Sequence, residues 1–407
     1  MPAHPLHDID PKLLGARIRD AREGRGLTQQ QMAERLGLSR TTVVALEKGE
    51  RRLKPAELVE IAAVLGRNVS EILPSRVSAA ESGAQLRGSL SALAPAGELA
   101  AAVDELQRLC EEYLKLEEIC AAPLRRRYPA EYEIQASDPN LAAEDVAASE
   151  RRRLDLGEGP LLPFREILEG DVGIRVFQLE MPPEVAGVYA CAEPFGACIA
   201  INLRHPAPRR RASLAHEYGH FLTARYRPEI TLQGRFERRP AAERFAAAFA
   251  RSFLLPAAGL RKRFLDLARE RPKGVTFGDL GRLAHFYFVS MEAMTRRLEE
   301  LRLVPAGTWD RLRRERSGGV REVERLPSLH DHQADDEPFS PRYVGLAVEA
   351  WQRGELSEGT LARVLRTDRL GARLQVEGLA RPIDENGEDG EDGGLDLGAP
   401  LFGAGAR

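Results

Sequence analysis

Two histidines and a glutamate form the strongest chemical pattern in this sequence. His216, Glu217 and His220 occupy an H-E-x-x-H run inside a stretch with helical periodicity. Residues four apart lie on one face of a helix, so both imidazoles can reach a single zinc ion. Glu217 borders that face, where it could accept a proton from a water whose pKa the zinc lowers to about 7. The pattern predicts a hydrolytic zinc site, although helical histidine pairs also occur as solvated or core residues.

A zinc site of this kind needs a third protein ligand and an open position for water or substrate. Glu243 is the best candidate, because it begins a helical run whose small alanines lie on the same side. An isolated carboxylate would be costly to bury there, whereas a metal ion would compensate its charge. The alternative is an exposed first-turn glutamate favoured by the helix dipole, with Glu237 as a second candidate ligand.

Further motifs surround these residues. A hairpin ends in Ala200-Ile-Asn202, the histidine helix is preceded by a basic run from Arg210, and the Glu243 segment ends in Leu-Leu-Pro256. Together, residues 185–256 resemble the ImmA/IrrE family of zinc metallopeptidases. The segment Phe288–Leu298 is similar to the small helical segment that follows the metal helices in that family.

The resemblance implies the role of each site residue. Tyr218 stands where leucine is usual, and Ala247 stands where the family commonly has asparagine or aspartate. Neither difference removes a ligand, but the second concerns how the Glu243 helix is held. The implied assignment is zinc ligation by His216, His220 and Glu243, with Glu217 as the general base.

The composition indicates a soluble globular protein of two or three domains. Of 407 residues, 43% are hydrophobic and 30% charged, and no apolar run approaches the roughly 18 residues of a membrane span. The start lacks a basic and then apolar signal peptide, so we expect a cytoplasmic protein without membrane partners. The four cysteines match no C-x-x-C zinc pattern, and we expect reduced packing thiols.

Residues 11–73 predict five short helices. Thr28 caps a helix that Gly37 ends, and Ser39 caps the next, so two helices are joined by a tight turn. This is a helix-turn-helix. The stretch is also basic, since residues 12–54 hold eleven Lys and Arg against five Asp and Glu.

The third of these helices, 40–47, would enter the major groove of DNA, where short polar side chains read bases and basic ones contact phosphates. The string from Leu38 to Arg51 closely resembles the recognition helix of Xre-type repressors. The alternative is a basic, solvated domain with no role in DNA binding. The DNA-contacting residues expected are Arg40, Thr41 and Thr42 at the bases, Gln29, Lys48 and Arg51 at the backbone, and the helix cap Ser39.

Residues 74–97 are rich in Pro, Ser, Gly and Ala and predict a linker. A connecting helix follows at 98–122. In it Leu99, Leu106, Tyr113 and Cys120 recur every seven residues. This seam could pair two chains, which would make a homodimer that reads two half-sites, or it could lie on the chain's own peptidase domain.

The rest of the chain predicts a mostly α protein whose second domain, 123–304, is an α+β zincin-like peptidase. Apolar runs at 172–179, 185–191 and 197–203 suggest a small antiparallel sheet beside the metal helix. Residues 341–370 predict a helical pair that forms a C-terminal appendage. The acidic, glycine-rich stretch 383–407 predicts a disordered tail.

The function that these features favour is a DNA-binding transcriptional regulator with a zinc-dependent endopeptidase domain. The family resemblance implies cleavage of a protein substrate, a repressor or antitoxin-like protein, under stress or on induction. One alternative is a transcription factor whose zincin-like domain senses a ligand or metal with little proteolysis. Another is self-cleavage within the linker at 74–97, which would release the DNA-binding domain.

Overall fold

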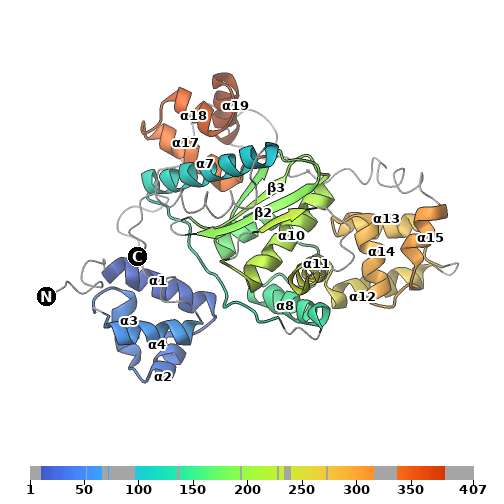
Figure 1. Ribbon diagram of the computed structural model, residues 1–407, viewed down its shortest axis with the longest axis horizontal. Coiled ribbons are helices and arrows are strands. Elements are labelled where there is room, and N and C mark those ends of the chain that lie inside the picture. Colours follow the sequence, from blue (N-terminus) through green and yellow to red (C-terminus); the bar gives the residue numbers. More distant parts are fainter. Residues whose placement is uncertain are drawn as a thin grey trace.

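A computed structural model describes residues 11–51, 53–66, 72, 97–134, 138–192, 195–226, 229–232, 240–271, 274–315 and 337–380. It is mostly helical, with one small sheet in the middle and helices on either side in sequence (Figure 1). Among the described residues, we find no helix with the length and apolarity that a membrane span requires. The proposed linker and the acidic tail lie almost wholly outside the described residues.

The N-terminal helices form a core of their own. They are α1 (Pro11–Gly24), α2 (Gln29–Leu36), α3 (Arg40–Glu47) and α4 (Pro55–Leu65). Ile18, Met32, Val43 and Ile61, one from each helix, are almost completely buried together. The predicted helix-turn-helix is therefore confirmed, whereas the fifth helix expected at 69–73 lies outside the described residues except for Ile72.

Local capping explains the bounds of the two middle helices. The hydroxyl of Thr28 accepts from the N–H of Gln31, whose side chain accepts in return from the N–H of Thr28. Gly37 ends α2 with a φ of 63°, a conformation that glycine adopts without strain. Ser39 then caps α3 by accepting from the N–H of Thr42 at 3.1 Å.

The sheet is mixed rather than antiparallel as the sequence suggested. Its strands are β1 (Arg175–Leu179), β2 (Val185–Ala192), β3 (Gly196–Asn202) and β4 (Glu229–Leu232), in the order β1-β3-β2-β4. Strand β2 is antiparallel to both β3 and β4, but β1 runs parallel to β3. The antiparallel hairpin β2–β3 was thus predicted correctly. The prediction for β1 was wrong, because β1 pairs in parallel with β3.

The connection between β1 and β2 explains that difference. It passes the end of β3, because β3 lies between β1 and β2 in the sheet. The amide of Asn202, the last residue of β3, donates to the carbonyls of Pro182 and Val185 at 2.9 and 2.8 Å. Its oxygen accepts from the N–H of Met181. Asn202 therefore satisfies the backbone groups of the crossing segment and fixes the mixed order.

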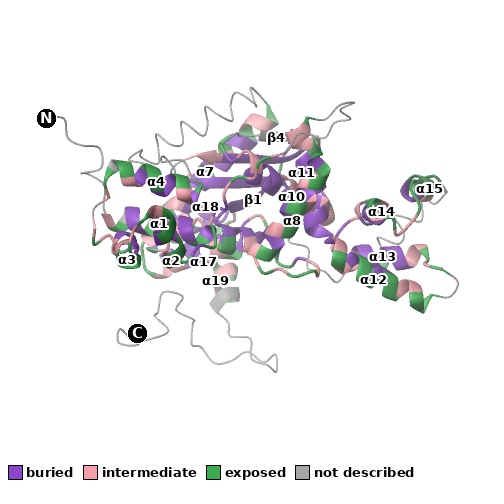
Figure 2. Cartoon of the chain, turned by 90° about the horizontal axis from the view of Figure 1, so that it is seen from below, coloured by how far each residue is buried: buried purple, intermediate pink, exposed green. Residues whose placement is uncertain are grey.

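Helices cover both faces of the sheet, and buried residues fill the space between (Figures 1 and 2). Neighbouring strand residues point to opposite faces, as a pleated strand requires. Tyr189 and Ile199 belong to one core with helices α8, α10 and α11, while Val188 and Cys198 belong to another with α7 and α17. The bounds of these helices are α7 (Glu98–Ile119), α8 (Pro139–Arg153), α10 (Ala207–Thr223), α11 (Ala241–Leu254) and α17 (Pro341–Gln352).

The seven-residue seam of α7 packs within its own chain. Leu106 and Tyr113 are fully buried, and Cys120 nearly so, against the sheet and α17. Arg342 of α17 pairs with Glu117 of α7 at 3.0 Å. Of the two possibilities open for this seam, the structure adopts the intramolecular one.

The C-terminal helices share the core of α7 instead of forming a separate appendage. Tyr343 of α17 lies edge-on to Tyr113, with ring centroids 5.0 Å apart. Arg366, after α18 (Glu358–Val364), pairs with Glu105 at 2.7 Å. A third helix, α19 (Arg369–Ala380), was not predicted from the sequence.

The remaining helices follow the sheet or precede it. Two of them, α12 and α15, were not predicted. For α12 the reason is that Pro256 was interpreted only as an end of α11, although it also precedes the first residue of α12. The helical turn α9 leads directly into the π-helical turn η1. The bounds are α9 (Phe164–Ile167), η1 (Leu168–Val172), α12 (Ala257–Glu270), α13 (Phe277–Phe286), α14 (Met291–Glu300) and α15 (Thr308–Glu315).

Candidate metal centre

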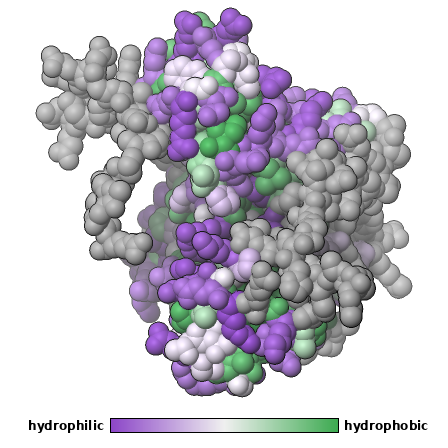
Figure 3. All heavy atoms as spheres, turned by 90° about the vertical axis from the view of Figure 1, so that its left-hand side faces the viewer, coloured by the Kyte–Doolittle hydropathy of each residue, from purple (hydrophilic) through white to green (hydrophobic). Residues whose placement is uncertain are grey.

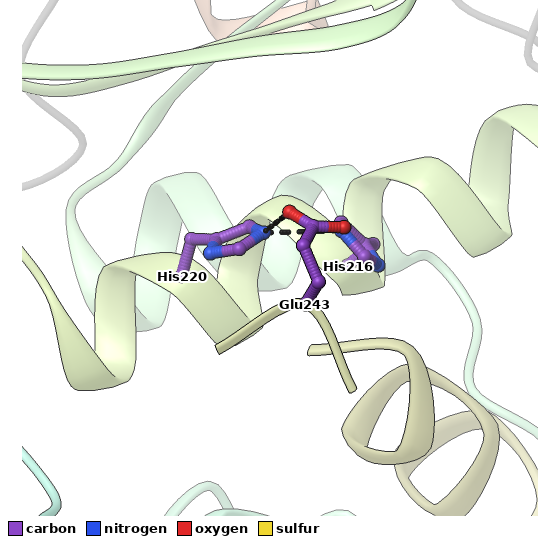
Figure 4. A group of neighbouring side chains, drawn as sticks. All are labelled: His216, His220 and Glu243. Atoms are coloured by element: carbon purple, nitrogen blue, oxygen red, sulfur yellow. Dashed lines mark hydrogen bonds and ion pairs between the residues drawn. The ribbon is translucent and has the colours of Figure 1, made fainter. Parts of the chain in front are cut away.

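Two helices bring three potential metal ligands together. His216 and His220 lie one turn apart on α10, and Glu243 lies in the first turn of α11 (Figure 4). The two Nε2 atoms are 3.1 Å apart. The Glu243 carboxylate lies 3.2 Å from His220 Nε2 and 3.5 Å from His216 Nε2. The three residues named from the sequence therefore converge, while Glu237 lies outside the described residues.

The spacing of these atoms fits one zinc ion. Zinc bonds of about 2.0–2.2 Å in a tetrahedron separate the ligand atoms by about 3.3–3.6 Å. The observed separations of 3.1, 3.2 and 3.5 Å lie close to that range. The side chain of His220 is 1% exposed, but those of His216 and Glu243 are 13% and 20% exposed. The group thus opens toward solvent on one side, where a catalytic zinc site needs a position for substrate.

A close helix crossing places Glu243 beside the histidines. Gly219 lies between Glu217 and His220 in sequence, and it packs against α11 at Ala246. A Cβ at position 219 would lie 3.1 Å from the Cα of Ala246, tighter than an ordinary contact. The absence of a side chain at 219 therefore allows α11 to approach. Gly219 is visible in the sequence, but the spacing of the motif does not show that another helix packs against it.

Glu217 is completely buried, with its side chain directed at strand β2. It follows His216 directly on α10, the position that an H-E-x-x-H pattern gives to a general base. Among the described residues, the group that could hold a metal ion consists of His216, His220 and Glu243. The Glu217 carboxylate is not part of that group.

A buried polar network explains why tyrosine replaces the usual leucine at 218. The hydroxyl of Tyr218 donates to the Glu150 carboxylate of α8. Arg153 donates to the Tyr218 hydroxyl at 3.1 Å and pairs with Glu150 at 2.7 Å, and Tyr132 donates to Glu150 at 2.9 Å. Burial raises the pKa of Tyr218 well above its ordinary value, so its hydroxyl stays a donor. The network fixes α10 to α8 directly behind the ligands.

Other contacts hold α11, so an asparagine or aspartate at 247 is not required. The carboxylate of Glu144 in α8 accepts from the Ser252 hydroxyl at 2.8 Å and from Arg297 of α14 at 2.6 Å. Arg151 donates to the carbonyl of Phe253 at 2.6 Å. These bonds anchor the carboxyl-terminal half of α11, while its first turn carries Glu243.

The candidate DNA-binding surface is of a different kind. Ser39, Arg40, Thr41 and Lys48 are exposed, and Thr42 is half-buried. Figure 3 shows hydrophilic side chains, with apolar ones among them, on one face of the molecule. The hydroxyl of Ser39 hydrogen-bonds to that of Thr41 at 2.8 Å, which orders the first turn of α3.

Two predicted backbone contacts already have partners in the protein. The Gln29 amide donates to Glu47 at 2.9 Å, and Arg51 pairs with Glu57 at 2.6 Å. A hollow beside the start of α2 is lined by Gln29 and Arg40 and also by Arg19, a residue that the sequence analysis did not name. Its lining also includes Arg22 and Glu23, and Glu23 pairs with Arg19 at 3.0 Å and with Arg22 at 3.2 Å, so two of the three arginines at the hollow are already paired with a carboxylate.

Comparison with known proteins gives two matches to family models. Residues 18–72 match the helix-turn-helix model, and residues 169–299 match the IrrE N-terminal-like domain of the peptidase M78 family. Over 52 residues the chain is 48% identical to an uncharacterized HTH-type transcriptional regulator of Methanothermobacter thermautotrophicus. That match covers 12% of this chain and 72% of the archaeal protein.

Proposed function

Because this chain belongs to the helix-turn-helix transcriptional regulators and carries an IrrE N-terminal-like peptidase domain, we propose that it is a DNA-binding regulator with a working zinc endopeptidase. Its substrate is a repressor or antitoxin-like protein that is cleaved in a stress or induction response. The observation that carries the proposal is the set of three ligand atoms at zinc spacing beside the buried Glu217.

Each site residue has a role in this proposal. A zinc ion at the site supplies Lewis acidity, which polarises a carbonyl and lowers the pKa of water to about 7. His216, His220 and Glu243 hold the metal. Glu217 accepts the proton of the attacking water and returns it to the leaving amine. The Tyr218 network holds α10 in a fixed position against α8, so the Glu217 carboxylate keeps its position relative to the ligands.

The N-terminal helices bind operator DNA in the same proposal. The first turn of α3 enters the major groove, with Arg40, Thr41 and Thr42 toward the bases. Lys48 contacts a backbone phosphate. We further propose a homodimer that reads two half-sites, and its contact must lie outside the α7 seam, because that seam is buried within the chain.

Comparison of the wild type with Glu217→Gln tests the peptidase. Both zinc-loaded proteins are incubated with repressor-like proteins encoded beside this chain, and the products are measured by intact mass. Glu118→Gln serves as the matched control, because Glu118 is exposed on α7 and lies outside the ligand group. We expect fragments from the wild type and from the control, but none from Glu217→Gln.

The same experiment separates the alternatives. If the fragments show cleavage within residues 74–97 of the chain itself, the chain cuts itself and the substrate is not a partner protein. Stoichiometric zinc without fragments from any of the three proteins would contradict the peptidase proposal. It would favour a sensor of a ligand or metal, a reading that the covalent fusion to a DNA-binding domain also supports.

A further inference from the structure

At Gly187, strand β2 has no side chain, and the buried Glu217 side chain occupies the space that a Cβ would take. A Cβ on Gly187 would lie 2.8 Å from the Oε1 of Glu217 and 3.1 Å from its Cγ. Contacts of 2.8 Å are too short for a real Cβ atom. The φ of Gly187 lies outside the left-handed region, so its backbone conformation does not itself demand glycine. A side chain at 187 would therefore force the Glu217 side chain to move.

Helix α10 cannot move away from the sheet to relieve such a contact. Tyr218, next in the chain, is bound to Glu150 and Arg153 of α8. Gly219 packs closely on Ala246 of α11. The helix is therefore held on the side opposite the sheet.

Strand β2 is fixed as well. Gly187 pairs with Ile201 of β3 and with Thr231 of β4, so neighbouring strands restrain it on both edges. The pairing with β4 shifts register between Val185 and Gly187, which places an irregularity of the strand next to the glycine. The distance between the strand and α10 is thus set from both sides.

We propose that Gly187 is a positioning residue for the general base: the bare backbone of β2 at this position sets where the Glu217 carboxylate lies relative to the metal ligands. This inference rests on the proposed function, because it assigns Glu217 the role of base. Its steric part concerns only the folded chain and is tested without any activity.

The first test substitutes Gly187→Ala. We expect one zinc per chain, as in the wild type, because none of the three ligands is touched. We expect kcat for cleavage of the partner protein to fall about 10- to 100-fold with little change in KM, because a displacement near 1 Å of a catalytic group has effects of that size. Gly345→Ala is the matched control, since a Cβ there meets open space. Wild-type kcat in Gly187→Ala would overturn the proposal.

The second test is a double-mutant cycle on the melting temperature of the full chain. Gly187→Ala is measured in the wild type and in Glu217→Ala, which removes the carboxylate and most of the side chain. We expect a clear loss of melting temperature in the wild type and a smaller one in the Glu217→Ala background. A remaining loss in both is expected from the carbonyl of Ala200, 3.2 Å from the same Cβ position. Equal losses in both backgrounds would overturn the proposal.

The two tests also keep this inference separate from the proposed function. An inactive wild type would refute the peptidase, and the cycle would still decide whether Gly187 positions the Glu217 side chain. An active wild type with no coupling in the cycle would leave the peptidase intact and refute the role of Gly187.

Discussion

The candidate metal centre and the candidate DNA-recognition surface place their side chains in different ways. At the metal centre, residues from two helices converge, and buried groups on α8, β2 and α14 decide where they lie. At the recognition surface, consecutive residues of α3 lie exposed, and a capped helix alone sets their directions. The first site depends on tertiary packing, and the second depends mainly on local structure.

The two regions also bury their carboxylates differently. In the N-terminal domain, Glu47 is paired with Arg22 at 2.5 Å and accepts from Gln29. In the peptidase-like domain, Glu169 accepts from the N–H of Val176 at 3.3 Å and from the Tyr113 hydroxyl at 3.5 Å. The paired carboxylate ties helices together through its ion pair, whereas burial raises the pKa of Glu169 to about 7. Substitutions at these residues therefore test whether the two regions are independent.

The largest effect is expected from breaking the buried pair. Arg22→Met leaves Glu47 buried without its cation, which costs about 3–5 kcal/mol of unfolding free energy. Because the described interactions of Arg22 are with Glu23, Leu27 and Glu47 and not with α10 or α11, we expect the loss to be confined to the N-terminal helices. Hydrogen exchange resolved by segment measures it, with zinc content as the control. Loss of zinc together with protection in α10 would show that the regions unfold as one.

Glu169→Gln gives an effect of about 3 kcal/mol that depends on pH. In the wild type the carboxyl ionises near 4.5 when unfolded and near 7 when folded. Stability is therefore full below about pH 4.5 and falls as the pH rises to 7. Glutamine removes this fall, so the variant should be the more stable protein at pH 8 and equal to the wild type near pH 4.5. Unfolding curves in urea at several pH values measure the difference, and parallel pH profiles would contradict it.

A smaller effect is expected at the exposed surface. Arg40→Ala should weaken operator binding by about 1–3 kcal/mol, because a base contact is lost while the helix persists. Arg35→Ala, at an exposed position on α2, is the matched control. Titration of fluorescent operator DNA at one fixed salt concentration measures both. Equal affinities of the two variants for the operator DNA would contradict a role for Arg40 in base recognition.

The same contrast explains what the sequence could predict. Helices α2 and α3 begin and end as expected, because Thr28, Gly37 and Ser39 act on their own neighbours. The histidine pair could be placed as well, since the period of one helix suffices. The parallel pairing of β1 could not, because it depends on Asn202 contacts with a segment about twenty residues away.

The sequence likewise did not determine what some residues pack against. A seven-residue seam such as that of α7 is apolar whether it meets a second chain or its own sheet. Gly219 and Gly187 appear in the sequence only as helix-breaking or strand-weakening residues, and their roles follow from what lies opposite them.

Zinc content of the purified chain tests the central claim most directly. Native mass spectrometry after dialysis would compare the wild type with His220→Ala, Glu243→Ala and Glu217→Gln. We predict one zinc per chain for the wild type and for Glu217→Gln, and none for the two ligand variants. A wild type without zinc, or a Glu243→Ala protein that keeps it, would contradict the assignment of His216, His220 and Glu243 as one metal centre.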